Sequence, residues 1–375
     1  MLSFQPGPKI DNQLKSLQEQ VVEIYQEVHA AAPEERAYLN RCALISNVGA
    51  TTRIENAVLT DAEIEWVDTE LTRSGRTTAF DEKKAYILDK LSKDRQRSLE
   101  EVAGSRDVLT TIYHQALEML PLSETIIRGL HHELLKFYPP AQRYAGSYKT
   151  VINKVIARNN ATGEERTVLQ PTDPGIMTEA AMQELVNWYN GTIREQTWPL
   201  LAAIEFNFRF LSIHPFQDGN GRMGRALFLL ILLHAGDKYL EGVVPYMAID
   251  RHIEQNRAQY YSVLHQASEG KYQPDPHAYH YAGLVAFFLR IFASALQDIR
   301  VYQERFRSLN ELSEAGVKVL ACFKSLPERQ LKVAEIEAHT KLPRRTIQFA
   351  LKKLTTAGFL QRQGKAAGAR YRLVF

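Results

Sequence analysis

The sequence predicts a mainly α-helical protein with one inserted β-hairpin and a small separate domain at its C-terminal end. Apolar residues recur three and four positions apart along most of the 375 residues, as on one face of a helix. Residues 146–174 are the exception, because they are rich in Val, Ile and Thr around a turn cluster. From Lys341 to Phe375 there are nine Lys or Arg and no Asp or Glu. Removing these nine charges from the net charge of +3 leaves −6 on the rest of the chain, and this asymmetry predicts a separate domain.

Helices are predicted on both sides of the hairpin. Residues 10–28 place apolar side chains at helical spacing. Thr60 opens the next predicted helix, and Glu63 three residues later completes a capping-box signature. Further amphipathic segments occupy residues 123–137, 177–190 and about 279–307.

The β-hairpin is predicted from residues 146–174, with its turn at "RNNATGEE" and its end at Pro171 and Pro174. An isolated hairpin is only marginally stable, so we expect this one to lie over another part of the molecule. From the sequence alone, it is either a flap over a functional site or a surface addition.

No targeting or membrane-spanning segment is predicted. The first residues lack the charged and apolar regions of a signal peptide. The longest apolar runs, 226–233 and 284–288, are too short to cross a bilayer. Cys42 and Cys322 match no metal or redox spacing. We therefore expect a reduced, cytoplasmic protein without membrane contact.

The stretch "HPFQDGNGRMGR", residues 214–225, predicts the functional site. Apolar residues precede and follow it at helical spacing, so "DGNG" is expected to be a tight turn that opens a second buried helix. Backbone amides at a helix N-terminus have no partner within the helix, and glycines let a ligand approach them closely. Such a nest is well suited to phosphate.

Charged side chains complete this predicted anion site. Arg222 and Arg225 lie three residues apart on one face of the helix start, where each can bind phosphate oxygens. Asp218 is a hard oxygen ligand, and Mg²⁺ commonly takes one or two carboxylates together with substrate phosphates. His214 is a residue type that serves as a general base near neutral pH. These are the groups that phosphoryl-type transfer needs.

Each of these residues also has a purely structural explanation. His214 could end one helix, Asp218 could cap the next, and the glycines could only make the turn. We favour a functional site because Arg222 and Arg225 crowd a helix N-terminus, where positive charge is unfavourable.

Residues 214–225 resemble the signature of the Fic family, HPFx[DE]GNGRxxR, at every defined position. "LHHELL", "GSYK" and the hairpin before the stretch and residues 253–268 after it extend the similarity, which covers about 124–296. The resemblance implies a Fic-type helical bundle. It also implies transfer of AMP from ATP to a Ser, Thr or Tyr hydroxyl of a protein, with release of pyrophosphate.

The resemblance implies a role for each site residue. His214 would take the proton from the target hydroxyl, Asp218 would hold Mg²⁺, and Phe216 would anchor the loop in the core. The hairpin would be a flap that aligns the target chain by strand pairing. Lys149 and Ser268 depart from residues that relatives carry there, so nucleotide affinity or base preference could differ. The residues implied to bind ATP are Gly219, Asn220, Gly221, Arg222, Gly224, Arg225, Thr167, Val168, Leu169, Gln170 and Tyr261.

A second motif, "TTRIENAVLT" at residues 51–60, is similar to the family's inhibitory pattern [ST]xxxE[GN]. Thr51, Glu55 and Asn56 fit that pattern. The Glu55 carboxylate could pair with Arg225 in place of the ATP γ-phosphate, so that ATP would bind only in a non-productive pose. Taken alone the pattern is an ordinary helix start, and its position before a complete Fic signature favours inhibition.

The C-terminal residues resemble a winged helix-turn-helix domain, with two helices followed by two short strands around "KAAGA". Pro343 opens the second helix and Gly358 ends it. The residues on or near the exposed face of that helix are Arg344, Arg345, Gln348, Lys352 and Lys353. This face could enter a DNA major groove, or the domain could dock or dimerise through protein contacts.

The sequence thus predicts three regions. They are an N-terminal helical region with the inhibitory helix (1–110), a Fic catalytic domain (111–305) and a winged helix-turn-helix domain (306–375). The predicted function is an ATP- and Mg²⁺-dependent protein adenylyltransferase inhibited by Glu55, which could also modify itself and could form a homodimer. Two alternatives stay open: a DNA-binding regulator with a nucleotide-sensing Fic core, and removal of AMP from modified proteins by the same site.

Overall fold

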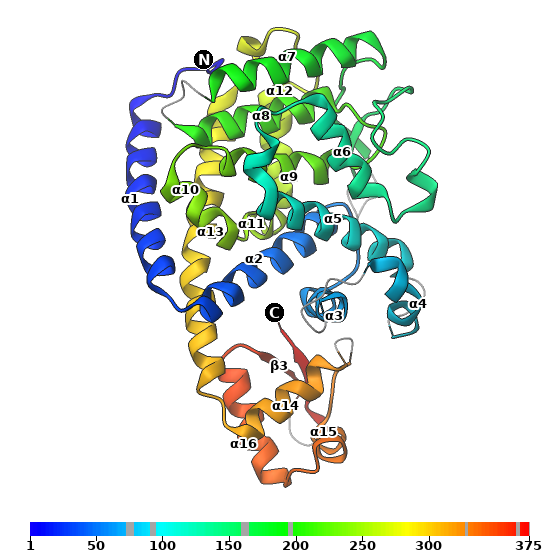
Figure 1. The fold of residues 1–375 in the computed structure, drawn as a ribbon, viewed down its shortest axis with the longest axis vertical. Helices are drawn as coiled ribbons and strands as arrows, with labels where there is room; N and C mark the ends of the chain where they lie inside the picture. Colours follow the sequence, from blue (N-terminus) through cyan, green and yellow to red (C-terminus); the bar gives the residue numbers. More distant parts are fainter. Residues whose placement is uncertain are drawn as a thin grey trace.

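The computed structural model is predominantly α-helical, as predicted (Figure 1). It describes residues 1–72, 79–90, 95–158, 165–193, 198–326, 329–364 and 368–374. Most of the predicted hairpin turn and most of "KAAGA" lie outside these described residues.

Two central helices, α8 (Pro199–Ile213) and α9 (Asn220–Leu233), form the middle of the larger part of the molecule and pack against each other. Almost every residue of both helices is buried, which accounts for their nearly continuous apolar sequence. The helices that pack around this pair include α2 (Pro33–Ile54), α5 (Gln96–Gln115) and α7 (Ile176–Thr192). The loop that joins α8 to α9 is therefore held on a rigid support.

The other predicted helices of this body are present. α1 (Pro8–Ala30) buries the apolar face predicted for residues 10–28 and packs along α10 (Lys238–Val243) and α13 (Tyr281–Asn310). Thr60 and Glu63 form the predicted capping box at the start of α3 (Asp61–Leu71). The remaining helices of the body are α4 (Phe80–Lys90), α6 (Glu124–Leu135), α10 (Lys238–Val243), α11 (Ile249–Gln255) and α12 (Arg257–Ser268).

The long helix α13 (Tyr281–Asn310) runs from the body to the C-terminal region (Figure 1). By length and composition alone it could cross a membrane, and 56% of its most apolar 18-residue window is buried inside the protein. Its buried residues, including Leu284, Phe288 and Leu296, belong to the core of the body. The helix therefore serves as a core helix here.

The predicted β-hairpin is confirmed. β1 (Val155–Arg158) pairs antiparallel with β2 (Glu165–Leu169). The end of β2 is tied to the residues after α12, because Gln170 N donates to Gly270 O and Tyr272 N donates to Gln170 O, both at 2.8 Å. The hairpin is thus fixed to the segment that follows α12.

The C-terminal residues form a second apolar core. Its elements follow the predicted order: α14 (Glu314–Lys324), α15 (Val333–Thr340), α16 (Arg344–Thr356), β3 (Leu360–Gln363) and β4 (Arg370–Leu373). β3 and β4 pair antiparallel, and Leu331 forms an isolated bridge to Tyr371. α13 continues beyond residue 305 to Asn310, and Leu309 packs on this second core.

Candidate active site

The loop between α8 and α9 is shaped by two left-handed residues. His214 ends α8 at φ 52°, and Gly219 precedes α9 at φ 78°. The Asn220 side chain holds the loop from inside, because its Oδ1 accepts from Phe216 N (2.9 Å) and its Nδ2 donates to Phe216 O (2.7 Å). Both polar atoms of this side chain, which was predicted to bind phosphate, are thus used by the loop.

His131 on α6 clamps the outer side of the loop. Its ring stacks on Phe216 with centroids 3.7 Å apart. Because Nδ1 accepts from Gly146 N (2.9 Å), Nε2 carries the proton and donates to Asp218 O (2.9 Å). Burial lowers the pKa of His131 to about 4, so the ring is neutral. The predicted anchoring of Phe216 in the core is confirmed, since it is fully buried.

The first turn of α9 offers unpaired backbone amides. Within a helix the amides of Asn220, Gly221 and Arg222 have no carbonyl partner. No side chain at position 221 would fit, because its Cβ would collide with the Glu55 carboxylate and lie 3.3 Å from Arg225 Nη1. Glu55 therefore occupies the space directly over the predicted anion nest.

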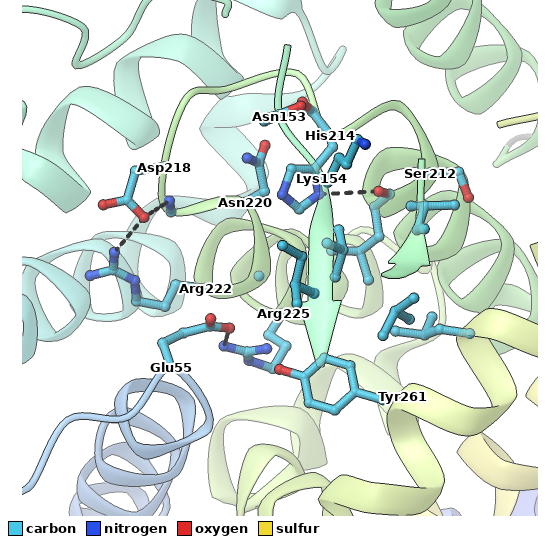
Figure 2. A pocket seen from close by; sticks show the side chains of 18 of the residues that line it. Glu55, Asn153, Lys154, Ser212, His214, Asp218, Asn220, Arg222, Arg225 and Tyr261 are labelled. Atoms are coloured by element: carbon cyan, nitrogen blue, oxygen red, sulfur yellow. Dashed lines mark hydrogen bonds and ion pairs between the residues drawn. The ribbon is translucent and has the colours of Figure 1, made fainter. Parts of the chain in front are cut away.

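Arg225 is completely buried and binds the end of α2 through three contacts, of which Figure 2 shows the one with Glu55. Its Nε donates to Thr51 Oγ1 (2.7 Å), and its Nη2 donates to Thr51 O and to Glu55 Oε1, both at 2.9 Å. The guanidinium donates a hydrogen bond to a carbonyl that has no partner at the helix C-terminus. It also neutralises a carboxylate that the helix dipole would otherwise repel. The predicted pair of Glu55 and Arg225 is present.

Arg53 fixes the same end of α2 from the other side. Its Nε and Nη2 donate to the two carboxylate oxygens of Glu254 on α11 at 2.7 and 2.9 Å. Its Nη1 donates to Asp61 Oδ1 at 2.7 Å. Such a fork fixes geometry as well as charge, so Glu55 is presented from a held helix end.

Arg222 is buried, and its Nε and Nη1 have no hydrogen-bond partner among the described residues. Its nearest carboxylates are Asp218, at 3.6 Å from Nη2, and Glu101, at 3.9 Å from Nη1. An incompletely paired buried guanidinium is costly, and an anionic ligand would supply the missing acceptors. Asp218 is 36% exposed, and its Oδ1 accepts from Gly219 N.

His214 faces the same space as these groups (Figure 2). Its Nδ1 lies 3.3 Å from Leu211 O, which makes Nδ1 the donor and leaves Nε2 as an acceptor. Burial, together with the charge of Lys149, lowers the pKa of His214 to about 4. The imidazole is therefore neutral at physiological pH and able to accept a proton.

Lys149 holds the end of α8 next to His214. This buried ammonium donates to Ile213 O and to Asn153 Oδ1, both at 3.1 Å, and burial lowers its pKa to about 8. Asn153 Nδ2 in turn donates to Phe216 O (2.9 Å). Sequence reasoning noted Lys149 only as a departure from relatives and missed Asn153, which no motif marked.

The hairpin covers the site, so the flap interpretation fits its position better than a surface addition. A cavity of about 240 Å³ lies between it and the α8–α9 loop. Each of the predicted residues that line this cavity comes from one of four elements: the end of α2, the loop with the start of α9, β2 or α12. These residues are Glu55, His214, Asp218, Gly219, Asn220, Gly221, Arg222, Arg225, Val168, Leu169 and Tyr261.

Five predicted residues do not line the cavity. Gly224 lies where α9 meets α8, and a Cβ there would come within 3.0 Å of Leu211 Cδ2. Thr51 holds Arg225 from behind, while Asn56 Oδ1 accepts from Arg257 Nη2 at 3.0 Å. Thr167 and Gln170 flank Val168 and Leu169, the two residues at the end of β2 that line the cavity.

Comparison with known proteins agrees with this geometry. The model of the Fic/DOC family matches residues 121–232. A protein named protein adenylyltransferase Fic from Drosophila mojavensis is 34% identical over 104 residues, which is 28% of this chain and 18% of that protein. The protein of the same name from Drosophila grimshawi matches over 28% of this chain and 19% of its own length, also at 34% identity. The match thus spans less than a fifth of these relatives.

Solved structures share the fold over a larger part of the chain. A Fic domain containing signaling protein from Bacteroides thetaiotaomicron superposes with a TM-score of 0.56 at 23% identity, covering 78% of this chain and 97% of that one. A Fic family protein from Desulfovibrio desulfuricans covers 100% of this chain and 98% of its own, with a TM-score of 0.53 at 19% identity. The chain therefore contains a Fic/DOC family domain at residues 121–232, and the solved neighbours share its fold over most of the chain.

Proposed function

We propose that this protein transfers AMP from ATP to a hydroxyl group of a protein and that Glu55 inhibits the transfer. The observation that carries the proposal is one cavity that holds a neutral imidazole, a carboxylate, a helix N-terminus and two buried arginines. The relatives named protein adenylyltransferase support the same chemistry.

The reaction replaces one phosphorus–oxygen bond by another. The target hydroxyl oxygen attacks the α-phosphorus, and the bond to the bridging oxygen of the β-phosphate breaks, so that pyrophosphate leaves. His214 Nε2 accepts the hydroxyl proton, for which a neutral ring with a free acceptor nitrogen is required. The Leu211 carbonyl and the Lys149 contacts hold that tautomer and position.

The ATP phosphates would bind at the start of α9. The free amides there and the dipole of a 14-residue helix favour anions, and Arg222 and Arg225 supply two planar cations. The Asp218 carboxylate, exposed to the cavity, fits the protein's share of a Mg²⁺ site, because this ion commonly takes a single carboxylate with phosphates and water. When bound, Mg²⁺ would neutralise phosphate charge.

Glu55 would inhibit by occupying the place of a terminal phosphate. Its carboxylate lies over Gly221 and binds Arg225, so a phosphate entering that place meets negative charge and a cation that is already paired. A pair of this kind is worth roughly 1.5–3 kcal/mol. ATP would therefore bind with its phosphates displaced from the productive position.

The proposal is tested by comparing label transfer from α-labelled and γ-labelled ATP in the Glu55→Gly protein. We expect transfer of the α-label only, with a mass increase of one AMP on the acceptor. Transfer of the γ-label would instead identify a kinase-type reaction. Absence of both labels from every acceptor, including the protein itself, would favour a nucleotide-sensing core without transfer.

A further inference from the structure

The exposed face of α16 is a stripe two residues wide. Exposed positions recur as pairs one turn apart along the helix, while Ile347, Leu351 and Leu354 on the opposite face are buried in the second core. The exposed pairs are Arg344 with Arg345, Gln348 with Phe349, and Lys352 with Lys353. Four of these six side chains are cations.

A groove separates this stripe from the β3–β4 hairpin. It encloses a cavity of about 620 Å³, with Arg344 and Lys352 on the α16 side and Arg362 and Tyr371 on the hairpin side. Arg362 and Tyr371 are direct cross-strand partners, so both side chains lie on the face of the hairpin that looks toward the helix. Guanidinium and ammonium groups thus line both walls of the groove.

The cations of this groove form no ion pair with any of the described residues. Glu337 is the last acidic residue of the sequence. Among the described residues, none forms an ion pair with Arg344, Lys352 or Arg362. Elsewhere the chain pairs its cations closely, as Arg300 pairs with both Glu23 and Glu27. Cations that lack carboxylate partners can neutralise the phosphates of a polyanion and so release the counter-ions condensed on it.

We propose that this groove binds the phosphate backbone of double-stranded DNA, with the exposed stripe of α16 placed in the major groove. A helix of 13 residues is about 20 Å long, and the major groove is about 12 Å wide and admits a helix. Arg362 on the hairpin would contact the backbone beside the helix. The remaining chain, with its net charge of −6, would be repelled from DNA, which favours an approach by this end.

An acidic protein partner fits the same surface less well. Protein interfaces have apolar and aromatic side chains at their centre, with charged residues depleted there. On this face Phe349 is the one exposed large apolar residue among those described, and the Lys353 ammonium lies 5.3 Å from its ring centre. Polar, strongly cationic surfaces are characteristic of DNA interfaces.

The test measures binding of the full chain to a fluorescent duplex of about 20 base pairs and arbitrary sequence, at KCl concentrations between about 50 and 200 mM. We expect affinity to fall steeply with salt. Arg344→Gln with Arg362→Gln should weaken binding roughly tenfold at the lowest salt and reduce the log–log salt slope by about 2. Lys352→Gln alone should reduce the slope by about 1.

The matched control is Arg370→Gln with Arg372→Gln. It removes the same net charge from the same domain, but these two arginines alternate with Tyr371 and so lie on the outer face of β4. The control should bind within about twofold of the wild type, and melting temperatures should show that all variants are folded.

Three outcomes would overturn the proposal. One is the absence of duplex binding at 50 mM KCl. Another is an equal loss of binding in the groove variant and the control, since that would reflect net charge alone. The third is tighter binding of polyglutamate than of the duplex at equal salt, which would assign the groove to an acidic protein.

Discussion

Arg225 Nη2 lies 2.9 Å from Glu55 Oε1 (Figure 2), and the same guanidinium binds the hydroxyl and the carbonyl of Thr51. This cation, at the start of α9, is thus engaged by the end of α2 through its Nε and Nη2. Because Arg53 ties this helix end to Glu254 and Asp61, its release requires either loss of the Glu55 carboxylate or movement of α2.

Replacing His214 with Ala should lower AMP transfer by about 10²- to 10⁴-fold in the Glu55→Gly background, which is the usual contribution of a general base. ATP affinity should change little, because His214 lies at the end of α8 and the anion nest belongs to α9. His114→Ala, at an exposed position of α5, is the matched control. Transfer near the control rate would show that another group accepts the proton.

Asp218→Ala should abolish transfer at every Mg²⁺ concentration, while the Glu55→Gly protein should lose activity on chelation and recover it when Mg²⁺ is added back. The reason is that Asp218 is the only carboxylate of the α8–α9 loop, residues 214–219. Equilibrium titration with Mn²⁺ and ATP, followed by electron paramagnetic resonance, reads metal binding without turnover. Metal-dependent activity that survives in Asp218→Ala would contradict the assignment.

The pH dependence of transfer should reveal the influence of Lys149. Since burial and this ammonium lower the pKa of His214 to about 4, the base stays neutral and activity should hold from neutral pH down to about 5. Lys149→Met removes the charge and keeps the bulk, so the acidic limb of kcat/KM should move up toward the ordinary value near 6.5. A limb that stays in place, in protein shown to be folded at each pH, would exclude this coupling.

The main helices and the anion nest could be predicted from sequence because their signals are local. The capping box at Thr60, the apolar face of α1 and the glycines beside Asn220 depend on neighbours within a turn or two. The same holds for Glu55, whose spacing from Thr51 places both at one helix end. The winged helix-turn-helix assignment stays a prediction, although the order of its elements is as expected.

Residues that act through distant contacts could not be predicted in the same way. His131 and Lys149 contact the loop from other segments, and "LHHELL" does not tell which histidine faces inward. Asn220 illustrates the reverse, because both polar atoms of its side chain bond to Phe216 in the loop and are not free for a phosphate. Gly224 lies one turn further along α9, where helix geometry directs it at α8.

The central claim is that the Glu55 carboxylate blocks the site, and the initial rate of α-label transfer in four proteins tests it most directly. Glu55→Gly should exceed the wild type by about ten- to a hundredfold, which corresponds to roughly 1.5–3 kcal/mol. Arg225→Ala should fall below the wild type, and the double variant should be as slow as Arg225→Ala. Glu311→Gly, which changes an exposed glutamate at the end of α13, should match the wild type. Equal rates for wild type and Glu55→Gly on an acceptor that both modify would contradict the account, as would loss of AMP removal in Glu55→Gly without a gain in transfer.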